Sequence, residues 1–462
     1  MRDLTPDRLS TDGTRGLLLA PDAVLTPDGL MDHYAAVVEG DTFRAVGPVQ
    51  QVERTHPHLR PVRLPGYVLM PGFVDTHHHL TQSFGAALAF GEPSEIFRRV
   101  WVPLEGALDE EAVYVAAKLA ALEALRGGFT TVAEAGTRAS VDVELVAAAA
   151  RDAGIRCVLG LVCNDLDGDT DTTLAAAEKH LARYSTEELV HPSLAISVPE
   201  AATERALART ARLAAEAGAV VQIHVNEHLA AVERSLVQHG LRPLEYLHEV
   251  GALGPQLLAA HATLLTPREV TLLADSGAAV SYNPVASAWK GNAVAPATTM
   301  AERGIRFGLG TDGTRGDAFR LAEAAEFAQR LTYGLATGDS SCGGGWTWLD
   351  RANRGGADAV GLSARTGTVT EGAAADFLLV DVDTPELRLS WDLPWELVRR
   401  GNRDQIDAVF VAGRLRLWRG RPVDWDGPAL VRRAAELAQE VLLRAPVTRV
   451  HPTAAEGWAA RP

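Results

Sequence analysis

The chain has 462 residues, of which 47% are apolar and 22% are charged, a composition typical of a globular protein with a large core. Its 59 acidic residues outnumber its 44 basic residues, so the formal net charge is −15. This excess of acid argues against a nucleic-acid partner, which needs a basic face, and against adhesion to an anionic membrane.

The two ends of the chain have the sequence pattern of short strands and turns. Within residues 1–68, apolar runs such as 35–38 and 43–46 are separated by Gly, Pro and Asp, and the same pattern returns within residues 364–425. We predict that these two segments form one small β-sandwich domain. Residues 426–462 are predicted to form a C-terminal helix, at 427–443, and a tail.

The middle of the chain, residues 69–363, alternates between strand-like and helical segments. Helical periodicity is clear at 111–126, 204–217 and 267–276. Eight apolar runs with strand character lie around and between them, at 68–74, 129–132, 157–162, 194–198, 220–224, 257–260, 278–282 and 305–310. Eight buried strands that alternate with helices predict an α/β fold, a (β/α)8 TIM barrel.

The N-terminus and the cysteines bear on the compartment. The segment MRDLTPDRLSTDG lacks the apolar core of a signal peptide, and no uncharged apolar run reaches the roughly 18–20 residues that span a bilayer. Cys157, Cys163 and Cys342 form no CxxC pair and no disulfide framework. We therefore expect a cytoplasmic protein with no membrane partner.

The clearest chemical signal is the run of three histidines that follows the first barrel strand. Alternate side chains of an extended strand end point the same way, so His77 and His79 can converge on one metal ion while His78 faces elsewhere. A histidine-rich loop without metal is the competing interpretation, and HxH alone does not decide between the two.

Further candidates follow three other strands. His224 ends the fifth predicted strand and Glu227 follows it, His261 follows the sixth, and Asp312 follows the eighth. Each has an ordinary explanation by itself, such as a core histidine or a helix N-cap. Catalytic groups of a (β/α)8 barrel, however, lie at the carboxyl ends of several strands, and all these residues fall there. Their combination predicts a metal-dependent active site.

These residues and their surroundings resemble the amidohydrolase superfamily. The similarity is to its triazine-hydrolase and aminohydrolase branch, which contains guanine, 8-oxoguanine and hydroxyatrazine deaminases. It runs from residues 68–80 through HVNEH, AAHATLL, SYNPVASAWK and GLGTDG to Gly367-Thr368-Val369 and Ala375-Asp376-Phe377.

The resemblance implies a hydrolase and assigns roles to the matching residues. His77, His79, His224 and Asp312 would bind one divalent metal, Zn²⁺ first and Fe²⁺ or Mn²⁺ as alternatives. Water activated by the metal would attack the amino-bearing carbon of an aromatic N-heterocycle, such as a guanine-like purine, pterin, pyrimidine or triazine, and ammonia would leave. Glu227 would shuttle protons, His261 would contact the water or the intermediate, and Asp312 would accept a proton.

The number of metal ions can also be predicted. Binuclear relatives bridge two metals with a carboxylated lysine on the fourth strand, but the matching segment SLAISVP has no lysine, and none of Lys118, Lys179 and Lys290 lies near it. We therefore expect a mononuclear site. Relatives often assemble, so a homodimer or higher homo-oligomer is expected.

Four residues are candidates for substrate contacts. Gln82 can donate to a ring carbonyl and accept from a ring N–H, as in the HHHLxQ segment of guanine-like deaminases, or it can cap a loop. Glu200, which stands where many relatives have His, suits an amino-bearing substrate or is a solvated acid. Trp289 and Arg315 are candidates for stacking and for an anionic substituent.

Two alternatives and one loop complete the expectations. The same site could displace chloride or an alkylamine, or cleave a cyclic C–N bond, and an inactive scaffold is the alternative outside enzymes. The glycine-rich segment 338–346 lacks the GK[ST] ending of a phosphate loop, and we expect it to be a lid or a substrate loop.

Overall fold

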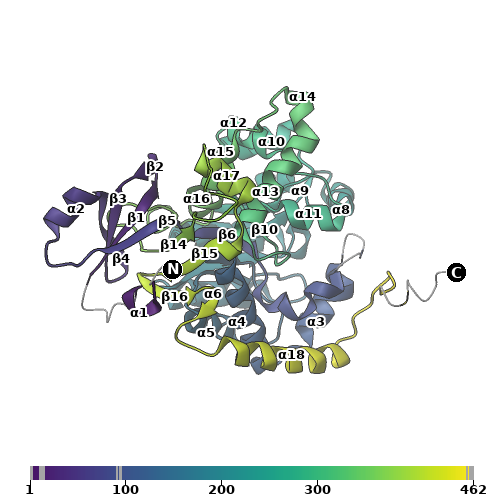
Figure 1. The fold of residues 1–462 in the computed structure, drawn as a ribbon. Helices are drawn as coiled ribbons and strands as arrows, with labels where there is room; N and C mark the ends of the chain where they lie inside the picture. Colours follow the sequence, from purple (N-terminus) through teal and green to yellow (C-terminus); the bar gives the residue numbers. More distant parts are fainter. Residues whose placement is uncertain (1–3, 10–15, 90–91, 93–95, 454–455, 457–462) are drawn as a thin grey trace.

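The computed structural model describes residues 4–9, 16–89, 92, 96–453 and 456 (Figure 1). Its larger part is an eight-stranded parallel sheet in which the strands follow one another in sequence order, so that it curves into a nearly closed barrel. The barrel strands are β6 (Phe73–His78), β7 (Phe129–Glu134), β8 (Arg156–Val162), β9 (Val190–Ile196), β10 (Val221–Val225), β11 (Leu257–His261), β12 (Ala279–Tyr282) and β13 (Arg306–Leu309).

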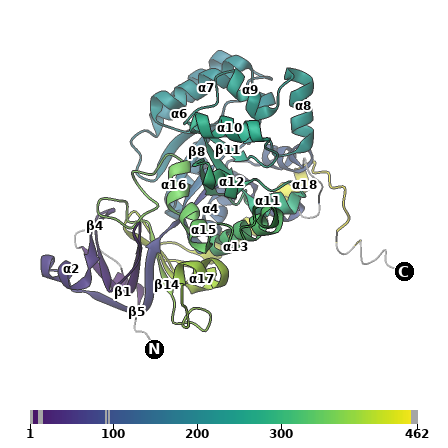
Figure 2. The same cartoon turned by 90° about the horizontal axis from the view of Figure 1, so that it is seen from above.

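Helices surround these strands, as the view from above shows (Figure 2). They include α4 (Glu110–Arg126), α5 (Glu144–Ala153), α6 (Thr170–Arg183), α7 (Glu204–Ala217), α8 (Leu229–His239), α9 (Pro243–Glu249), α10 (Pro267–Ser276), α11 (Pro284–Lys290), α12 (Ala297–Glu302) and α13 (Ala318–Gln329). Because helices cover the barrel, its strands are largely buried and read as continuous apolar runs. The predicted (β/α)8 barrel is confirmed.

The two edges of the barrel sheet, at β6 and just beyond β13, are joined by hydrogen bonds. The backbone N–H of Asp312, just beyond β13, donates to the carbonyl oxygen of His77 in β6 at 2.8 Å. The hydroxyl of Thr311 donates to the carboxylate of Asp75, also in β6, at 2.5 Å. These bonds join the first strand of the barrel to the segment after the last one.

The two ends of the chain form a nine-stranded mixed sheet beside the barrel. Its order is β17-β16-β15-β14-β5-β1-β3-β4, with β2 paired to β1. One apolar core mixes side chains from both ends of the chain, and the rings of Phe43 and Phe377 lie 5.5 Å apart in it. The strands are β1 (Leu17–Thr26), β2 (Gly29–Asp32), β3 (Tyr34–Glu39), β4 (Thr42–Pro48), β5 (Val62–Pro71), β14 (Phe377–Asp381), β15 (Ile406–Val411), β16 (Arg414–Trp418) and β17 (Arg421–Pro422).

One strand boundary differs from the prediction. The apolar run 68–74, which we expected to be a single barrel strand, spans the end of β5 and the start of β6. The chain passes from one sheet to the other at Gly72, where an added Cβ would lie 2.1 Å from the hydroxyl oxygen of Thr130. Only glycine allows this close approach, and apolarity alone cannot show the change of sheet.

The last long helix, α18 (Gly427–Arg444), packs along α4 and confirms the predicted C-terminal helix. Parts of the predicted tail and of the N-terminal segment, at 1–3, 10–15, 454–455 and 457–462, lie outside the described residues. Among the helices that the structure describes, none is long and apolar enough to cross a membrane.

Candidate metal centre and substrate cavity

Four histidines meet at the carboxyl end of the barrel. His77 lies in β6, His79 directly follows it, and His224 and His261 lie at the ends of β10 and β11. The centre of the His77 ring is 4.9 Å from that of His79, 4.7 Å from that of His224 and 5.3 Å from that of His261. Strands far apart in the sequence therefore bring four imidazoles into one cluster.

Asp312 completes the cluster with a carboxylate. Its Oδ1 lies 3.5 Å from Nε2 of His77 and 3.6 Å from Nε2 of His79, and the Nε2 atoms of His79 and His224 are 3.3 Å apart. Burial, reinforced by the neighbouring His77, lowers the pKa of His79 and His224 well below the usual value, so both imidazoles are neutral. Neutral imidazole is the form that binds a metal ion.

The cluster has the donor atoms of a metal-ion site. Nε2 of His77 and Nε2 of His261 are buried and have no hydrogen-bond partner, which is rare for polar atoms unless a ligand or ion satisfies them. The Nδ1 atom of His224 donates to the carbonyl oxygen of Ser197 at 2.7 Å, which leaves its Nε2 lone pair directed at the cluster. Such a second bond commonly orients a histidine that binds metal.

Backbone strain accompanies these side chains. Asn226, His261 and Asp312 have φ angles of 53°, 73° and 53°, in the left-handed region that favours glycine. They follow or end β10, β11 and β13. Strained residues of this kind concentrate at functional sites, and here they mark three of the strand ends that carry the cluster.

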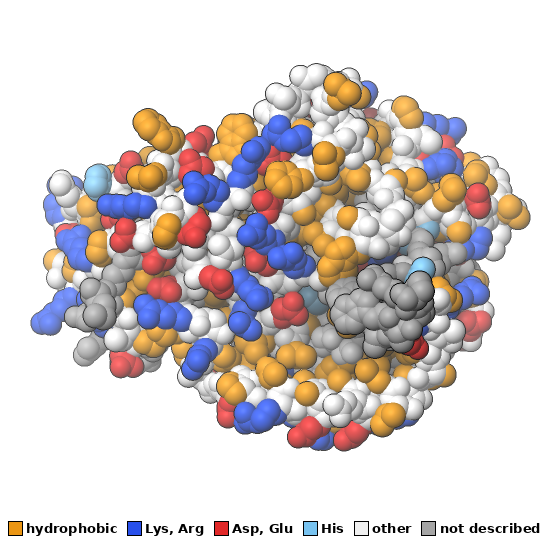
Figure 3. Space-filling view, turned by 45° about the vertical axis from the view of Figure 1, so that its right-hand side comes forward, with side chains coloured by type: hydrophobic (Ala, Val, Ile, Leu, Met, Phe, Trp, Pro, Cys, Tyr) orange, Lys and Arg blue, Asp and Glu red, His pale blue; other side chains and the backbone are white. Residues whose placement is uncertain are grey.

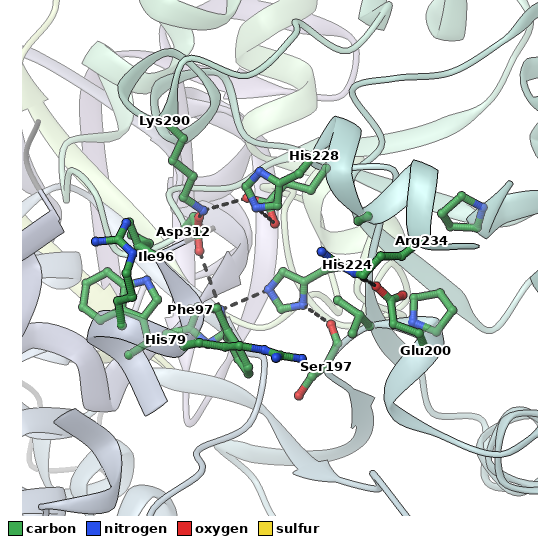
Figure 4. Close-up of a pocket in the computed structure, with 18 of the residues that line it drawn as sticks. His79, Ile96, Phe97, Ser197, Glu200, His224, His228, Arg234, Lys290 and Asp312 are labelled. Atoms are coloured by element: carbon green, nitrogen blue, oxygen red, sulfur yellow. Dashed lines mark hydrogen bonds and ion pairs between the residues drawn. The ribbon is translucent and has the colours of Figure 1, made fainter. Parts of the chain in front are cut away.

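A second carboxylate, Glu227, lies beside the cluster. Its Oε1 is 3.6 Å from Nε2 of His261 and accepts from Nζ of Lys290 at 2.8 Å, while its Oε2 lies 3.1 Å from Nε2 of His228. Figure 4 shows where Lys290 and His228 lie in the pocket. Burial acts to raise the pKa of Glu227, but the neighbouring His261 and the ammonium of Lys290 outweigh it and hold that pKa well below its usual range.

A cavity of about 550 Å³ opens onto the cluster. Its walls include Gln82 and Phe97 beyond β6, Ser197 and Glu200 beyond β9, and Arg234 of α8. The cavity has the size and enclosure of a small-molecule site.

Figure 3 shows acidic and basic side chains interspersed over one face of the molecule, with no continuous basic surface on that face.

A comparison of the sequence with known protein families agrees with the metal-site geometry described above. A profile described as "Amidohydrolase family" matches residues 68–416, which is most of the chain. The chain belongs to the amidohydrolase family. The predicted resemblance is confirmed.

Relatives of this amidohydrolase include two deaminases that are each 30% identical to it. One is the 5-methylthioadenosine/S-adenosylhomocysteine deaminase of Syntrophobacter fumaroxidans, with 86% of this chain and 92% of the relative covered. The other is the 5'-deoxyadenosine deaminase of Methanopyrus kandleri, with 92% and 98% covered.

Solved structures show the same fold. A zinc-bound adenosine deaminase from Xanthomonas campestris superposes with a TM-score of 0.83 at 25% identity, over 92% of this chain and 98% of the other. A mutant of atrazine chlorohydrolase from Arthrobacter aurescens, complexed with zinc and atraton, gives a TM-score of 0.80 at 21% identity, over 91% of this chain and 100% of the other. At that identity the second likeness concerns the fold alone.

The structure places the four predicted substrate-contact residues of the amidohydrolase differently with respect to the cavities. Gln82 and Glu200 line the main cavity, and Nη2 of Arg234 donates to Oε1 of Glu200 at 3.2 Å. Trp289, 43% exposed, lines a smaller neighbouring cavity together with His79 and Gln82.

Arg315 is exposed and lines neither cavity, so the geometry does not support its predicted substrate contact. The chain turns between Thr311 and Thr314, through Gly313 with a φ of 67°, and Thr314 and Gly316 line the smaller cavity whereas Arg315 between them does not.

The glycine-rich segment 338–346 is also placed differently from our expectation. Its residues line neither cavity. It joins α14 (Leu335–Thr337) to α15 (Gly345–Ala352), and a Cβ on Gly345 would lie 2.0 Å from the ring of Trp395 in α17 (Leu393–Arg400). Gly345 thus packs α15 closely against α17, and the geometry does not support a lid or substrate loop over the cavity.

Sequence reasoning missed two neighbours of Glu227, His228 and Lys290. The sequence pattern assigns no role to His228, and Lys290 enters the sequence analysis only as one of the lysines that lie far from the fourth strand. A signal for Lys290 was available, because it is one of only three lysines in the chain and ends the helix that directly follows β12.

Proposed function

We propose that this amidohydrolase is a metal-dependent hydrolytic deaminase of an aromatic N-heterocycle, with an adenine-type nucleoside as the favoured class. The observation that carries the proposal is the position of Glu227, a buried carboxylate beside a His/Asp metal cluster at the inner end of a cavity. The two relatives named as deaminases of adenosine derivatives support the nucleoside class.

We propose that His77, His79, His224 and Asp312 hold one metal ion, with zinc first and Fe²⁺ or Mn²⁺ as alternatives. The four residues supply imidazole nitrogens and a carboxylate oxygen, a donor set that suits zinc, and β9 contains no lysine to bridge a second ion. Such an ion lowers the pKa of a bound water, and so supplies a nucleophile near neutral pH.

The residues around the ion divide the proton transfers among them. The attacking water supplies both protons. Glu227, which is ionised, can take the first and deliver it to a ring nitrogen, and Asp312 can accept the second before Glu227 delivers it to the departing amine. Ammonia leaves only with that second proton, because an amide anion is a very poor leaving group. Oε1 of Glu227 lies close enough to His261 for both residues to act on one substrate atom.

His261 can donate a hydrogen bond to the oxygen that develops charge. The side-chain nitrogen of Asn283 lies 3.2 Å from Nδ1 of His261, and the amide oxygen of Asn283 accepts from Ser281. This assignment makes Nδ1 the acceptor, so the proton of the neutral ring is on Nε2, which has no partner. Burial lowers the pKa of His261 to about 4, which keeps the ring neutral at physiological pH.

An ammonia-release assay on zinc-reconstituted protein tests the proposal. The panel contains adenosine, 5'-deoxyadenosine, 5'-methylthioadenosine, S-adenosylhomocysteine, guanine, a pterin, cytosine and an aminotriazine. We expect ammonia from at least one adenine nucleoside and one equivalent of metal per chain. Release of chloride or alkylamine from a triazine, or ring opening without ammonia, would favour the alternatives, and two equivalents of metal would contradict the mononuclear site.

The cellular location and the oligomeric state of the protein are also proposals. The cytoplasm is our proposed location, on the argument that the three cysteines, all free and buried, need no oxidising compartment. Assembly into a homodimer or higher homo-oligomer stays a prediction.

A further inference from the structure

The ammonium group of Lys290 lies between the two carboxylates of the site. Its Nζ donates to Oε1 of Glu227 at 2.8 Å and to Oδ2 of Asp312 at 2.6 Å (Figure 4). The side chains of Lys290, Glu227 and Asp312 are only 16%, 10% and 6% exposed, so water screens these contacts weakly.

Each carboxylate uses one oxygen for Lys290 and keeps the other for a different task. Asp312 turns Oδ2 to Lys290, which leaves Oδ1 facing the imidazoles of His77 and His79. Glu227 turns Oε1 to Lys290 and Oε2 to His228. A single cation therefore fixes the rotation of both carboxylates.

Two buried carboxylates so close to one amine would repel each other without a cation between them. Removing one partner of a buried charge pair leaves an uncompensated charge, which is strongly destabilising. Lysine suits this place because its compact ammonium carries three donors that can reach two partners at short distance, whereas a guanidinium is wider and planar.

We propose that Lys290 is a positioning residue that locks Glu227 and Asp312 in their working orientations. Glu227 is thereby held where it can move a proton to the substrate, and Asp312 presents one fixed oxygen to the metal ligands. The catalytic part of this inference rests on the proposed deaminase function. The two hydrogen bonds from Lys290 to Glu227 and Asp312, which we call the clamp, are a property of the protein without substrate.

Kinetics of three single variants test the catalytic part. K290M keeps the length of the side chain and removes its charge, and we expect kcat to fall by about 100-fold with KM changed by less than about threefold, as for loss of a group that orients a general acid–base. K290R keeps the charge and should recover at least about tenfold of that loss. K179M removes an exposed lysine of α6 and should match the wild type.

A double-mutant cycle distinguishes a positioning role from general damage. If Lys290 acts through Glu227, the substitution K290M should lower kcat far less in an E227Q background than in the wild type. Additive losses in kcat, or a K290M enzyme within about threefold of the wild-type kcat, would overturn the proposal.

Thermal unfolding of the metal-free protein tests the clamp without any substrate. We expect K290M to lower Tm by about 5 °C and K290R to lower it less, because only K290M leaves two buried carboxylates without a cation. An unchanged Tm for metal-free K290M would contradict the clamp. If K290M does not fold, K290Q, which keeps one donor, replaces it in both measurements. Absence of activity on every heterocycle would overturn the proposed function, but it would not affect the thermal-unfolding test of the clamp.

Discussion

At the scale of single residues, Glu227 and Asp312 should differ in what they do for the metal. Glu227→Gln keeps the shape of the side chain and loses the carboxylate that moves protons, so we expect kcat to fall by about 10³-fold while metal content stays at the wild-type level. Asp312→Asn removes a proposed metal ligand and should lower both kcat and the metal content. Metal analysis of the two purified variants beside their kcat values checks the pair; turnover of Glu227→Gln near the wild-type rate would remove Glu227 from the mechanism.

The sequence located some residues of the site well and others poorly, for a physical reason. His224 and His261 end apolar runs, and in a barrel the carboxyl ends of all strands meet, so their convergence follows from counting strands. Lys290 reaches the cluster only because α11 begins directly after β12 and runs back over the site. The position of Arg315 depends on a left-handed glycine turn. Neither the path of a loop nor the sense of a turn is expressed in hydrophobic periodicity.

At the scale of elements, the C-terminal tail forms part of the cavity wall. Val450 lines the cavity, and the backbone N–H groups of Val450 and His451 donate to the carboxylate of Glu92 at 3.1 and 3.2 Å. The N–H of Thr448 donates to the carbonyl oxygen of Arg99, a residue of η2 (Phe97–Trp101) that also lines the cavity. The tail is thus bonded to a neighbouring segment that lines the same cavity.

Removal of this tail should change substrate binding more than chemistry. A chain that ends at Arg444 loses Val450 from the wall, and we expect KM to rise about three- to tenfold, the effect of losing about 1 kcal/mol of apolar contact, with kcat within about twofold. A chain that ends at Thr453 keeps all the tail contacts described above and serves as the control. Equal KM values for the two truncated chains would show that the tail takes no part in binding.

Elements of regular periodicity were the most predictable part of the fold. Helix α7 begins and ends where its pattern predicted, because Thr203 caps its first turn and Gly218 ends it with a φ of 65°. The boundary at Gly72 was not predictable in the same way. Both strands around it are apolar, and which sheet each joins is decided by pairing with strands more than 50 residues away, such as β7 and β14.

At the scale of the whole molecule, a buried ion pair ties the barrel to the sheet domain. Nε of Arg156, the first residue of β8, donates to Oδ2 of Asp376 at 2.8 Å, and Asp376 also accepts from the hydroxyl of Thr366 and the N–H of Ala412. His191 in β9 joins this junction, because Nη1 of Arg156 donates to its Nε2 at 3.2 Å. Nε2 can accept that bond only while the imidazole is neutral.

This junction predicts a measurable loss of stability in acid. Burial, together with the charge of Arg156, lowers the pKa of His191 to about 3, whereas the unfolded chain has the ordinary value of 6.5. Below pH 6.5 the unfolded chain therefore takes up a proton that the folded protein does not, and the free energy of unfolding falls as the pH drops toward 3, by up to about 1.4 kcal/mol per pH unit.

The variant His191→Gln isolates this contribution, since glutamine keeps an acceptor for Arg156 and does not titrate. Urea unfolding at pH 7 and pH 5 should show the wild type losing about 1–2 kcal/mol more than His191→Gln over that interval, while the other buried histidines contribute equally to both proteins and cancel. His58→Gln, at an exposed position between α2 (Val49–Thr55) and β5, should behave as the wild type. The same pH dependence in all three proteins would mean that His191 is protonated equally in the folded and unfolded states, and that the Arg156 contact does not hold it neutral.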